Sequence, residues 1–424
     1  MSPNLFRNLF LALLGVKVMV RVVLNLLNLV HLRRNAGKVP PMLDGLIDGD
    51  QLRAIDSYTA DKIRFRLIGF IYDTLLLALF LFTPLFAAYS GWIDSLPWPG
   101  FWKSLLFFLL PGWAAWLADL PFDYYFHFVI ESRFGFNKYT RAGWLLDAVK
   151  NLLVTTGLTV VVLAVVLAIW GGRTQFGLYD VLAAWAMIMA MTLILMYLVP
   201  VLLIPFFYKL RPLPDGELKE AITAMVSGSG FAVRGVFIAD QSSKSAHANA
   251  QFAGVGKSKT IILFDTLVQN YSIPEILAVL AHEIGHGKRR HLVRMISFVL
   301  AESLLFLIFA FHLLGAGYTF AAFGVPPSFH AGLFVTYILF FDILVFYAQP
   351  LFSRLSRKME YEADDYSRRL TGTVTPLVSV FRKFIVNEMD NINPHPWYEA
   401  FYYSHPALLK RIKALERKQS EPSS

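Results

Sequence analysis

One short run of residues has the types and spacing of a metal-binding catalytic site: His282-Glu-Ile-Gly-His286. Histidines four residues apart lie on the same face of a helix and can both bind one Zn²⁺, with the intervening Glu283 beside them as general base. Ser272 and Glu275 form the pattern of a capping box, so we expect the helix to begin there. The alternative is a polar helix face without metal, but the apolar turn 276–280 predicts a packed helix.

A catalytic zinc site needs a third protein ligand and one open position for water. The segment 353–370 has helical character and places Glu360 and Asp364 four residues apart. We predict that Glu360 binds the metal and that Asp364 accepts a proton from the far nitrogen of a zinc histidine. Glu362 lies about 200° around the helix from Glu360, so its loss should leave the metal in place. The alternative is a solvated acidic stretch paired with neighbouring basic residues: Arg354, Arg357 and Lys358.

The composition indicates that these motifs belong to a membrane protein. Of 424 residues, 56% are hydrophobic and 16% are charged, against roughly 45–50% and 25% in soluble proteins. There is no cysteine, which excludes disulfides and Cys-ligated metal. Seven apolar stretches have about the length that a membrane span requires: 5–30, 66–90, 101–129, 142–170, 178–207, 292–323 and 331–352. The first is interrupted by Lys17, Arg21 and several Asn, so an interfacial amphipathic helix is its alternative.

The connections between these stretches alternate between basic and non-basic. This alternation predicts an external N-terminus and a cytoplasmic C-terminus, with the polar segments 208–291 and 353–424 both cytoplasmic. The spans within 292–352 form a hairpin that returns the chain to the same face, so the two motifs can share one metal. The net charge of +9 follows this membrane topology and argues against a nucleic-acid partner.

The domain organisation follows from these boundaries. Residues 1–207 hold the first five spans, 208–291 the first part of a polar domain with the His282 motif, 292–352 the last two spans, and 353–424 the second part of that domain with the Glu360 motif. Three strand-like runs, 233–239, 247–253 and 260–264, predict a small sheet, with a hairpin turn at Gly254-Val-Gly256. Ionisable residues inside the spans indicate a bundle with a wet interior, or side chains that snorkel to the interface: Asp73, Lys103, Asp119, Asp147, Glu302, His312 and Asp342.

Further polar residues are candidates for contacts with a substrate. We predict that the strand 247–253 pairs with an extended peptide, with His247 and Asn249 as substrate-binding residues. His405, in Ser404-His-Pro406, and Arg411 are candidates for stabilising the oxyanion of a tetrahedral intermediate. For His405 the alternative is a role in a surface loop.

The chain resembles the integral-membrane zinc metalloproteases of the CAAX prenyl protease 1 type. The resemblance includes the segments 128–138, 245–254 and 263–266, together with the His282, Glu360 and His405 motifs. It implies seven helices around a large water-filled chamber, one Zn²⁺ at the cytoplasmic end, and cleavage of a C-terminal tripeptide from isoprenylated substrates.

The sequence therefore predicts a mainly α, multi-pass membrane protein with a zincin-like cytoplasmic metalloprotease domain. Its partners would be the lipid bilayer and a peptide or prenylated protein. The lack of a long eukaryotic-style insertion or a retrieval signal favours a bacterial inner membrane and the clearing of membrane-associated peptides; a eukaryotic chain would lie in the endoplasmic reticulum membrane. The alternative function is a seven-helix transport or receptor-like protein with a structural or vestigial metal site, which the intramembrane charges would support.

Overall fold

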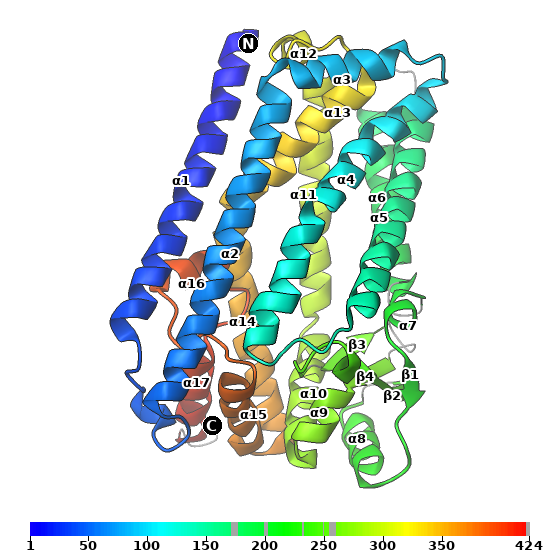
Figure 1. Ribbon diagram of the computed structural model, residues 1–424. Coiled ribbons are helices and arrows are strands. Elements are labelled where there is room, and N and C mark those ends of the chain that lie inside the picture. Colours follow the sequence, from blue (N-terminus) through cyan, green and yellow to red (C-terminus); the bar gives the residue numbers. More distant parts are fainter. Residues whose placement is uncertain (171–176, 199–201, 231–232, 249, 254–259, 421–424) are drawn as a thin grey trace.

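The computed structural model describes residues 1–170, 177–198, 202–230, 233–248, 250–253 and 260–420. Within this part, seven helical segments are long and apolar enough to cross a membrane, as predicted. They stand side by side, with the sheet at one end of the bundle (Figure 1). These segments are α1 (Pro3–Asn35), α2 (Gly49–Phe82), α4 (Gly100–Tyr125) with a π-helical turn (Phe126–Glu131), α5 (Arg141–Trp170), α6 (Leu178–Leu198), α11 (His291–Leu314), and α13 (Phe329–Tyr337) with a π-helical turn (Ile338–Leu344) and α14 (Val345–Thr371).

The second predicted stretch is divided between two helices. α2 begins much earlier than residue 66, because the Asp48 carboxylate accepts a hydrogen bond from the Gln51 backbone at 2.8 Å and caps the helix. It ends at Phe82, where Thr83 caps a new helix, α3 (Pro84–Ser95), that has a proline in its first turn. Proline suits a first turn because its missing N–H has no partner there. α3 lies across the end of the bundle (Figure 1).

Two other predicted boundaries also move. The sixth span ends at Leu314, and a short helix, α12 (Gly317–Ala321), follows it. The segment 353–370 is not a separate helix, because α14 continues without a break from the seventh span. The acidic motif is therefore carried on the C-terminal extension of a helix that is apolar enough to span a membrane.

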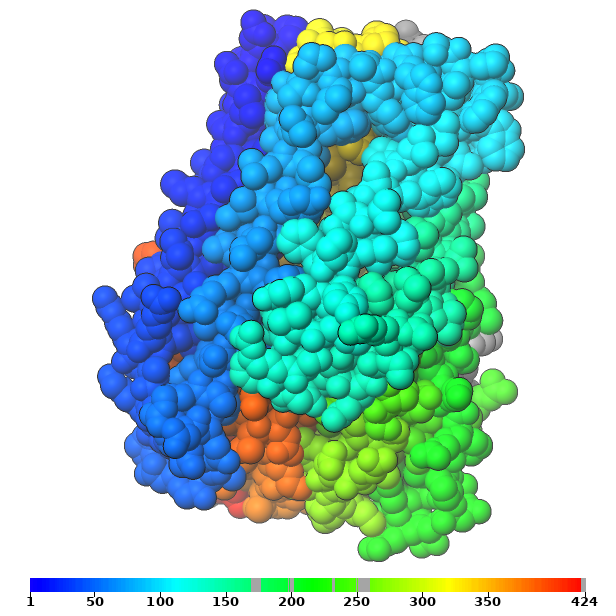
Figure 2. Space-filling model, viewed as in Figure 1, coloured from blue at the N-terminus to red at the C-terminus, as the bar shows by residue number. Residues whose placement is uncertain are grey.

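The first predicted span is interrupted by charged residues, and these residues face the other helices. α1 runs along the bundle (Figure 1), and its Lys17 is only 4% exposed. The Lys17 ammonium lies 2.6 Å from Asp342 in the second π-helical turn. Both residues line a pocket of about 530 Å³ together with Asp73 and Asp119. Figure 2 shows an opening between α2 and α4 through which more distant, yellow segments are visible, in agreement with a bundle that is hollow.

The predicted strands form a four-stranded sheet of order β1-β2-β4-β3 in the described part of the chain. The strands are β1 (Leu210–Pro212), β2 (Gly235–Ala239), β3 (Ala250–Ala253) and β4 (Thr260–Phe264). β2 and β4 are parallel, and β3 pairs antiparallel with β4 from Ala253 opposite Thr260, as the predicted hairpin requires. Its turn, Gly254 to Gly256, lies outside the described residues. β1 was not predicted, because three residues that include a proline carry no strand pattern.

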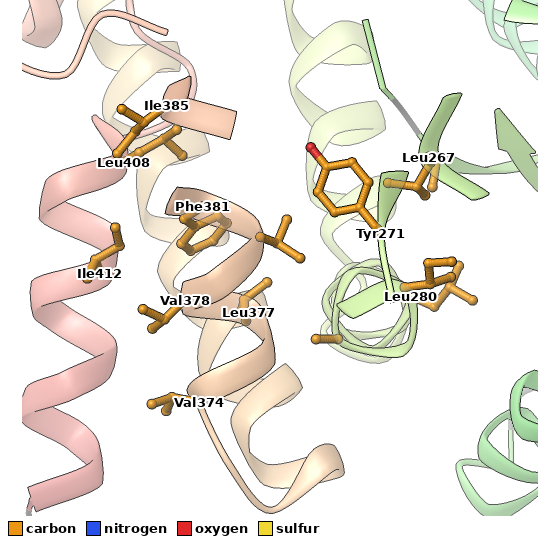
Figure 3. Packing of buried hydrophobic residues seen from close by; sticks show 14 of the residues in the cluster. Leu267, Tyr271, Leu280, Val374, Leu377, Val378, Phe381, Ile385, Leu408 and Ile412 are labelled. Atoms are coloured by element: carbon orange, nitrogen blue, oxygen red, sulfur yellow. The ribbon is translucent and has the colours of Figure 1, made fainter. Parts of the chain in front are cut away.

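One hydrophobic core unites the protease segments at the end of the bundle. Leu280 of α10 (Ile273–Lys288), Phe381 of α15 (Thr375–Asn387) and Ile412 of α17 (Leu408–Ser420) are each at most 3% exposed and belong to it. Figure 3 shows α15 packed between α10 and α17 through such side chains. This core fixes the position of α10 against the C-terminal segment. The remaining helices are α7 (Ile204–Phe207), α8 (Glu217–Gly228), α9 (Asp265–Asn270) and α16 (Pro396–Tyr402).

Candidate metal centre

The helix that carries the two histidines lies directly on the helix that carries the acidic motif. Gly285 of α10 makes this possible, because a Cβ at this position would lie 3.0 Å from Tyr366 Cβ and 3.1 Å from Ala363 Cα. One turn before His282, the Ala278 carbonyl of α10 accepts a hydrogen bond from the Ser367 hydroxyl of α14 at 2.8 Å. The predicted capping box is also present, since the Ser272 N–H donates to the Glu275 carboxylate at 2.8 Å.

The three predicted metal ligands converge on one point. The Nε2 atoms of His282 and His286 are 3.1 Å apart, and the two Glu360 oxygens lie 3.5 Å and 3.4 Å from them. Tetrahedral zinc with bonds of about 2.0–2.2 Å separates its ligand atoms by about 3.4 Å. Glu360 Oε2 is buried and accepts no hydrogen bond in the described structure. Two imidazole nitrogens and an unsatisfied carboxylate oxygen therefore fit a single zinc ion.

Asp364 and Arg411 lie behind these ligands. Asp364 Oδ1 is 2.8 Å from His282 Nδ1, so this nitrogen donates to the carboxylate and Nε2 is left for the metal. The Arg411 guanidinium donates two hydrogen bonds to Asp364, at 2.9 and 2.6 Å, and lies 3.2 Å from Glu360 Oε2. Its carbon is 4.3 Å from the centre of the Phe381 ring. These contacts favour a positioning role for Arg411 rather than direct contact with an oxyanion.

A second chain of contacts leads away from His286 and was not predicted. His286 Nδ1 lies 2.9 Å from His291 Nδ1, and His291 Nε2 lies 3.1 Å from Glu362. His291 is 2% exposed, and Glu362 is also held by Arg294 at 3.0 Å. The helical period separates Glu362 from Glu360 as expected, but His291 extends its influence to the metal ligand. The signal in the sequence is a histidine five residues beyond His286, at the start of α11.

The proposed general base and the nearby histidine complete the centre. Burial raises the pKa of Glu283, and the nearby His282 and His286 lower it by a smaller amount. No hydrogen bond engages the Glu283 carboxylate in the described part of the chain. His405 Nε2 lies 3.3 Å from Glu360 Oε1, and the His405 side chain is 64% exposed. His405 therefore stands at the open side of the centre.

His247 is held between two carboxylates. Its Nε2 is 3.2 Å from Glu131, and its Nδ1 contacts Glu388. Phe136 stacks on the imidazole at 4.3 Å between ring centres, and the Tyr58 hydroxyl donates to Glu131 at 2.5 Å. Burial lowers the pKa of His247, but the hydrogen bonds that the imidazole donates to Glu131 and Glu388 outweigh it and raise the pKa to about 9. These partners come from the membrane bundle and from the residue that follows α15, and sequence reasoning did not identify them.

We call the contacts of His247 with Glu131, Glu388 and Phe136 the His247 clamp. This clamp positions the beginning of an edge strand. The Thr266 hydroxyl donates to the His247 carbonyl at 2.9 Å, which ties the segment to the first turn of α9, directly after β4. β3 lies at the edge of the sheet, where its outer side can pair with another strand. Asn249 lies outside the described residues. The assignment of His247 and Asn249 to substrate binding stays a prediction.

Comparisons with known proteins place the whole chain in one family. Residues 28–209 match the family "CAAX prenyl protease N-terminal, five membrane helices", and residues 212–419 match peptidase family M48. The chain is 34% identical to the CAAX prenyl protease 1 of Saccharomyces cerevisiae, over 89% of this chain and 88% of that protein. A homologue of this protease from Oryza sativa is 32% identical, over 90% and 91% of the two chains.

A solved structure agrees with the sequence relatives. The crystal structure of S. mikatae Ste24p matches with a TM-score of 0.90 and 28% identity, covering 97% of this chain and 99% of that one. The transport or receptor-like alternative gains no support from these matches. Together with the convergence of His282, His286 and Glu360 where α10 meets α14, they establish that the chain belongs to the CAAX prenyl protease 1 family of membrane-embedded M48 metalloproteases.

Proposed function

We propose that the protein is a zinc metalloendopeptidase with one Zn²⁺ on His282, His286 and Glu360. The observation that carries the proposal is the convergence of these three donors, whose ligand atoms lie within 4.8 Å of one another. Zinc bound there would polarise the scissile carbonyl and lower the pKa of a water molecule. Three protein ligands leave a fourth position open, as hydrolysis requires.

The side chains around the ligands supply the proton transfers. Glu283 takes a proton from the attacking water and delivers it to the leaving amine. Its buried setting raises its pKa, which favours holding that proton between the two steps. His405, exposed beside Glu360, donates a hydrogen bond to the oxyanion. Arg411 acts through Asp364, which fixes the tautomer of His282.

The peptide would lie along the outer edge of β3. Main-chain hydrogen bonds from an edge strand hold a substrate in extended form without demanding particular side chains. Asn249, the residue before β3, would contact the substrate main chain. The clamp on His247 would keep this edge in register with the metal centre.

The relatives named as CAAX prenyl proteases suggest the substrate class. We propose that the protein cleaves near the C-terminus of isoprenylated peptides, with cleavage of other membrane-associated peptides as the second candidate. The site lies on the cytoplasmic side, as the basic connections predict. The relatives reported above are eukaryotic and give no support to a bacterial inner membrane; an endoplasmic reticulum location is the corresponding proposal.

The test uses the purified full-length protein with a prenylated CAAX peptide and its unprenylated twin. We expect cleavage of the prenylated peptide, loss of activity on chelation and recovery with zinc. The Glu283→Gln variant should retain zinc and lose activity by about 10²–10⁴-fold. Cleavage that persists in this variant would refute the assignment of Glu283. Equal cleavage of both peptides would reject the prenyl requirement and leave the peptidase proposal intact.

A further inference from the structure

A cationic pocket lies on the face of α14 that is turned away from the metal centre. It has a volume of about 530 Å³. Six of its lining residues are cationic and two, Glu362 and Asp365, are acidic. The cationic residues are Arg289, Arg294, Arg354, Arg357, Lys358 and Lys418. The pocket therefore carries a positive charge that its own carboxylates do not balance.

Three of these cations have no carboxylate or backbone-carbonyl partner in the part of the chain that the structure describes. Arg294 and Lys418 pair with the two carboxylates at 3.0 and 3.1 Å, and Arg357 donates to backbone carbonyls. By contrast, Arg289, Arg354 and Lys358 are exposed and have no carboxylate within ion-pair distance among the described residues. Unpaired cations around one concave surface can bind an anion with several oxygens.

The position of the pocket along α14 indicates where that anion comes from. By the 3.6-residue period, Arg354 and Lys358 lie about 120° and 160° from Glu360, and Leu351 about 180°. Leu351 is 57% exposed and stands one turn nearer the membrane than Arg354. An exposed apolar face thus gives way to a cationic face within one turn, as at the boundary between hydrocarbon and headgroups.

The neighbouring helix shows the same change. Arg289 and Arg294 flank the start of α11, where Leu292, Val293 and Met295 are 48%, 57% and 53% exposed. α11 and α14 lie side by side at this level, since the rings of Phe298 and Phe352 are 5.9 Å apart. Two adjacent helices therefore offer cations to a headgroup and apolar side chains to acyl chains.

We propose that this pocket binds the phosphate of an anionic phospholipid from the cytoplasmic leaflet. Basic pockets between membrane helices on the cytoplasmic side are suited to such headgroups. Arg354 and Lys358 would contact the phosphate, and the acyl chains would lie along Leu351 and the first turn of α11. The site is separate from the peptide site, because it lies on the opposite face of α14 from Glu360.

The experiment measures lipid retention by the full-length protein with native mass spectrometry. The protein is held in mixed micelles with equal amounts of phosphatidic acid and phosphatidylcholine, and a second sample receives water-soluble glycerol phosphate. We expect preferential retention of phosphatidic acid by wild type. The double variant Arg354→Gln/Lys358→Gln should reduce the preference by roughly tenfold to thirtyfold, since each basic residue near a membrane surface contributes about 1 kcal/mol.

The matched control is Lys209→Gln/Arg211→Gln, which removes the same two charges from exposed positions around the start of β1. It should retain the wild-type preference. Equal loss in both double variants would reduce the effect to net charge and overturn the proposal. Retention of the preference by Arg354→Gln/Lys358→Gln, with zinc content normal, would also overturn it. Equally tight binding of glycerol phosphate would assign the pocket to a soluble anion instead.

Discussion

At the residue scale, the metal ligands differ in what holds them. His282 is oriented by Asp364, which Arg411 holds in turn. His286 is oriented by the imidazole of His291, which in turn contacts the Glu362 carboxylate. Residues behind metal ligands fix their orientation and commonly change affinity or activity by 10–100-fold when mutated. The two histidines should therefore respond to different mutations.

The helical period alone predicts that loss of Glu362 leaves the metal in place. Because Glu362 contacts His291, which contacts His286, we instead predict that Glu362→Gln weakens zinc binding although Glu362 is not a ligand. Loss of the carboxylate frees His291 to rotate, and His286 loses the contact that orients it. Zinc affinity should fall by roughly 10–100-fold, as measured by competition with a chelator. Glu360→Ala should lose zinc outright, because it removes a ligand.

The matched control for this prediction is Asp365→Asn, an acidic residue on the same side of α14. Asp365 pairs with Arg368, Arg369 and Lys418 and not with a metal ligand. The zinc affinity of the Asp365→Asn variant should equal that of wild type. If Asp365→Asn emptied the site while Glu362→Gln did not, the path through His291 would be refuted.

At the scale of elements, the metal centre depends on how closely α10 and α14 approach. Three ligands come from two helices whose backbones meet at Gly285 and Ala363. The core around Phe381 and Leu280 holds α10 from the other side. The geometry of the site is therefore sensitive to side-chain volume at a residue that binds nothing.

We predict that Gly285→Ala separates the two helices and lowers both stability and zinc content. Its Cβ would meet Tyr366 Cβ and the backbone of Ala363 at 3.0–3.2 Å, so one helix must shift. Overpacking of this kind costs about 1–3 kcal/mol. Thermal unfolding in detergent and zinc analysis measure the two effects. Gly228→Ala in α8, where a Cβ meets nothing within 4 Å, should leave both unchanged.

The clamp between the bundle and β3 predicts a dependence on pH. The pKa of His247 is raised to about 9 by Glu131 and Glu388, whereas an unfolded histidine titrates near 6.5. Its stabilisation is fully present below pH 6.5 and is lost as pH rises through about 9. The difference in melting temperature between wild type and His247→Gln should therefore shrink from pH 7 to pH 10.

Glu388→Gln provides the companion measurement for the same clamp. Removal of one carboxylate should move the midpoint of the pH effect downward from about 9. Tyr58, Lys62 and Asp390 also face this cluster, and they remain in both variants. A stability difference that stayed constant across the pH range would contradict the clamp.

At the scale of the whole molecule, the shared metal site requires both motifs to be on one side of the membrane. α11 leaves that side directly after α10, and α13 and α14 return the chain to it. Figure 1 shows α12 at the end of the bundle opposite the C-terminus. The segment 324–330 has no Lys or Arg, whereas the C-terminal segment is basic, and this difference predicts a cytoplasmic location for the C-terminal segment.

We therefore predict opposite locations for two reporter fusions. A reporter inserted after Pro327 should be external, and one fused to the C-terminus should be cytoplasmic. Accessibility to a membrane-impermeant label in intact cells measures each location. Both reporters on one side would contradict the hairpin and with it the shared metal site.

The features that depend on local periodicity could be predicted from the amino-acid sequence alone. Each of these features can be read from a single continuous segment of the sequence. They are the seven apolar stretches, the capping box at Ser272, and the four-residue spacings His282–His286 and Glu360–Asp364. Each follows from the 3.6-residue period or from the cost of exposing polar groups to lipid. The fold class and the candidate ligands could therefore be predicted, although helix ends moved where Thr83 and Pro84 start a new helix.

The contacts between these helices became visible only in the folded structure. His291 and Glu362 are 71 residues apart in the chain, and His247 and Glu388 are 141 apart. No local pattern relates such pairs, because their contact depends on the packing of separate helices around a shared core. The close approach at Gly285 is likewise invisible in sequence, since a glycine next to a zinc histidine has many explanations until Ala363 is seen against it. The candidate ligands can be read from two separate helices, but the metal site forms only where those helices pack against each other.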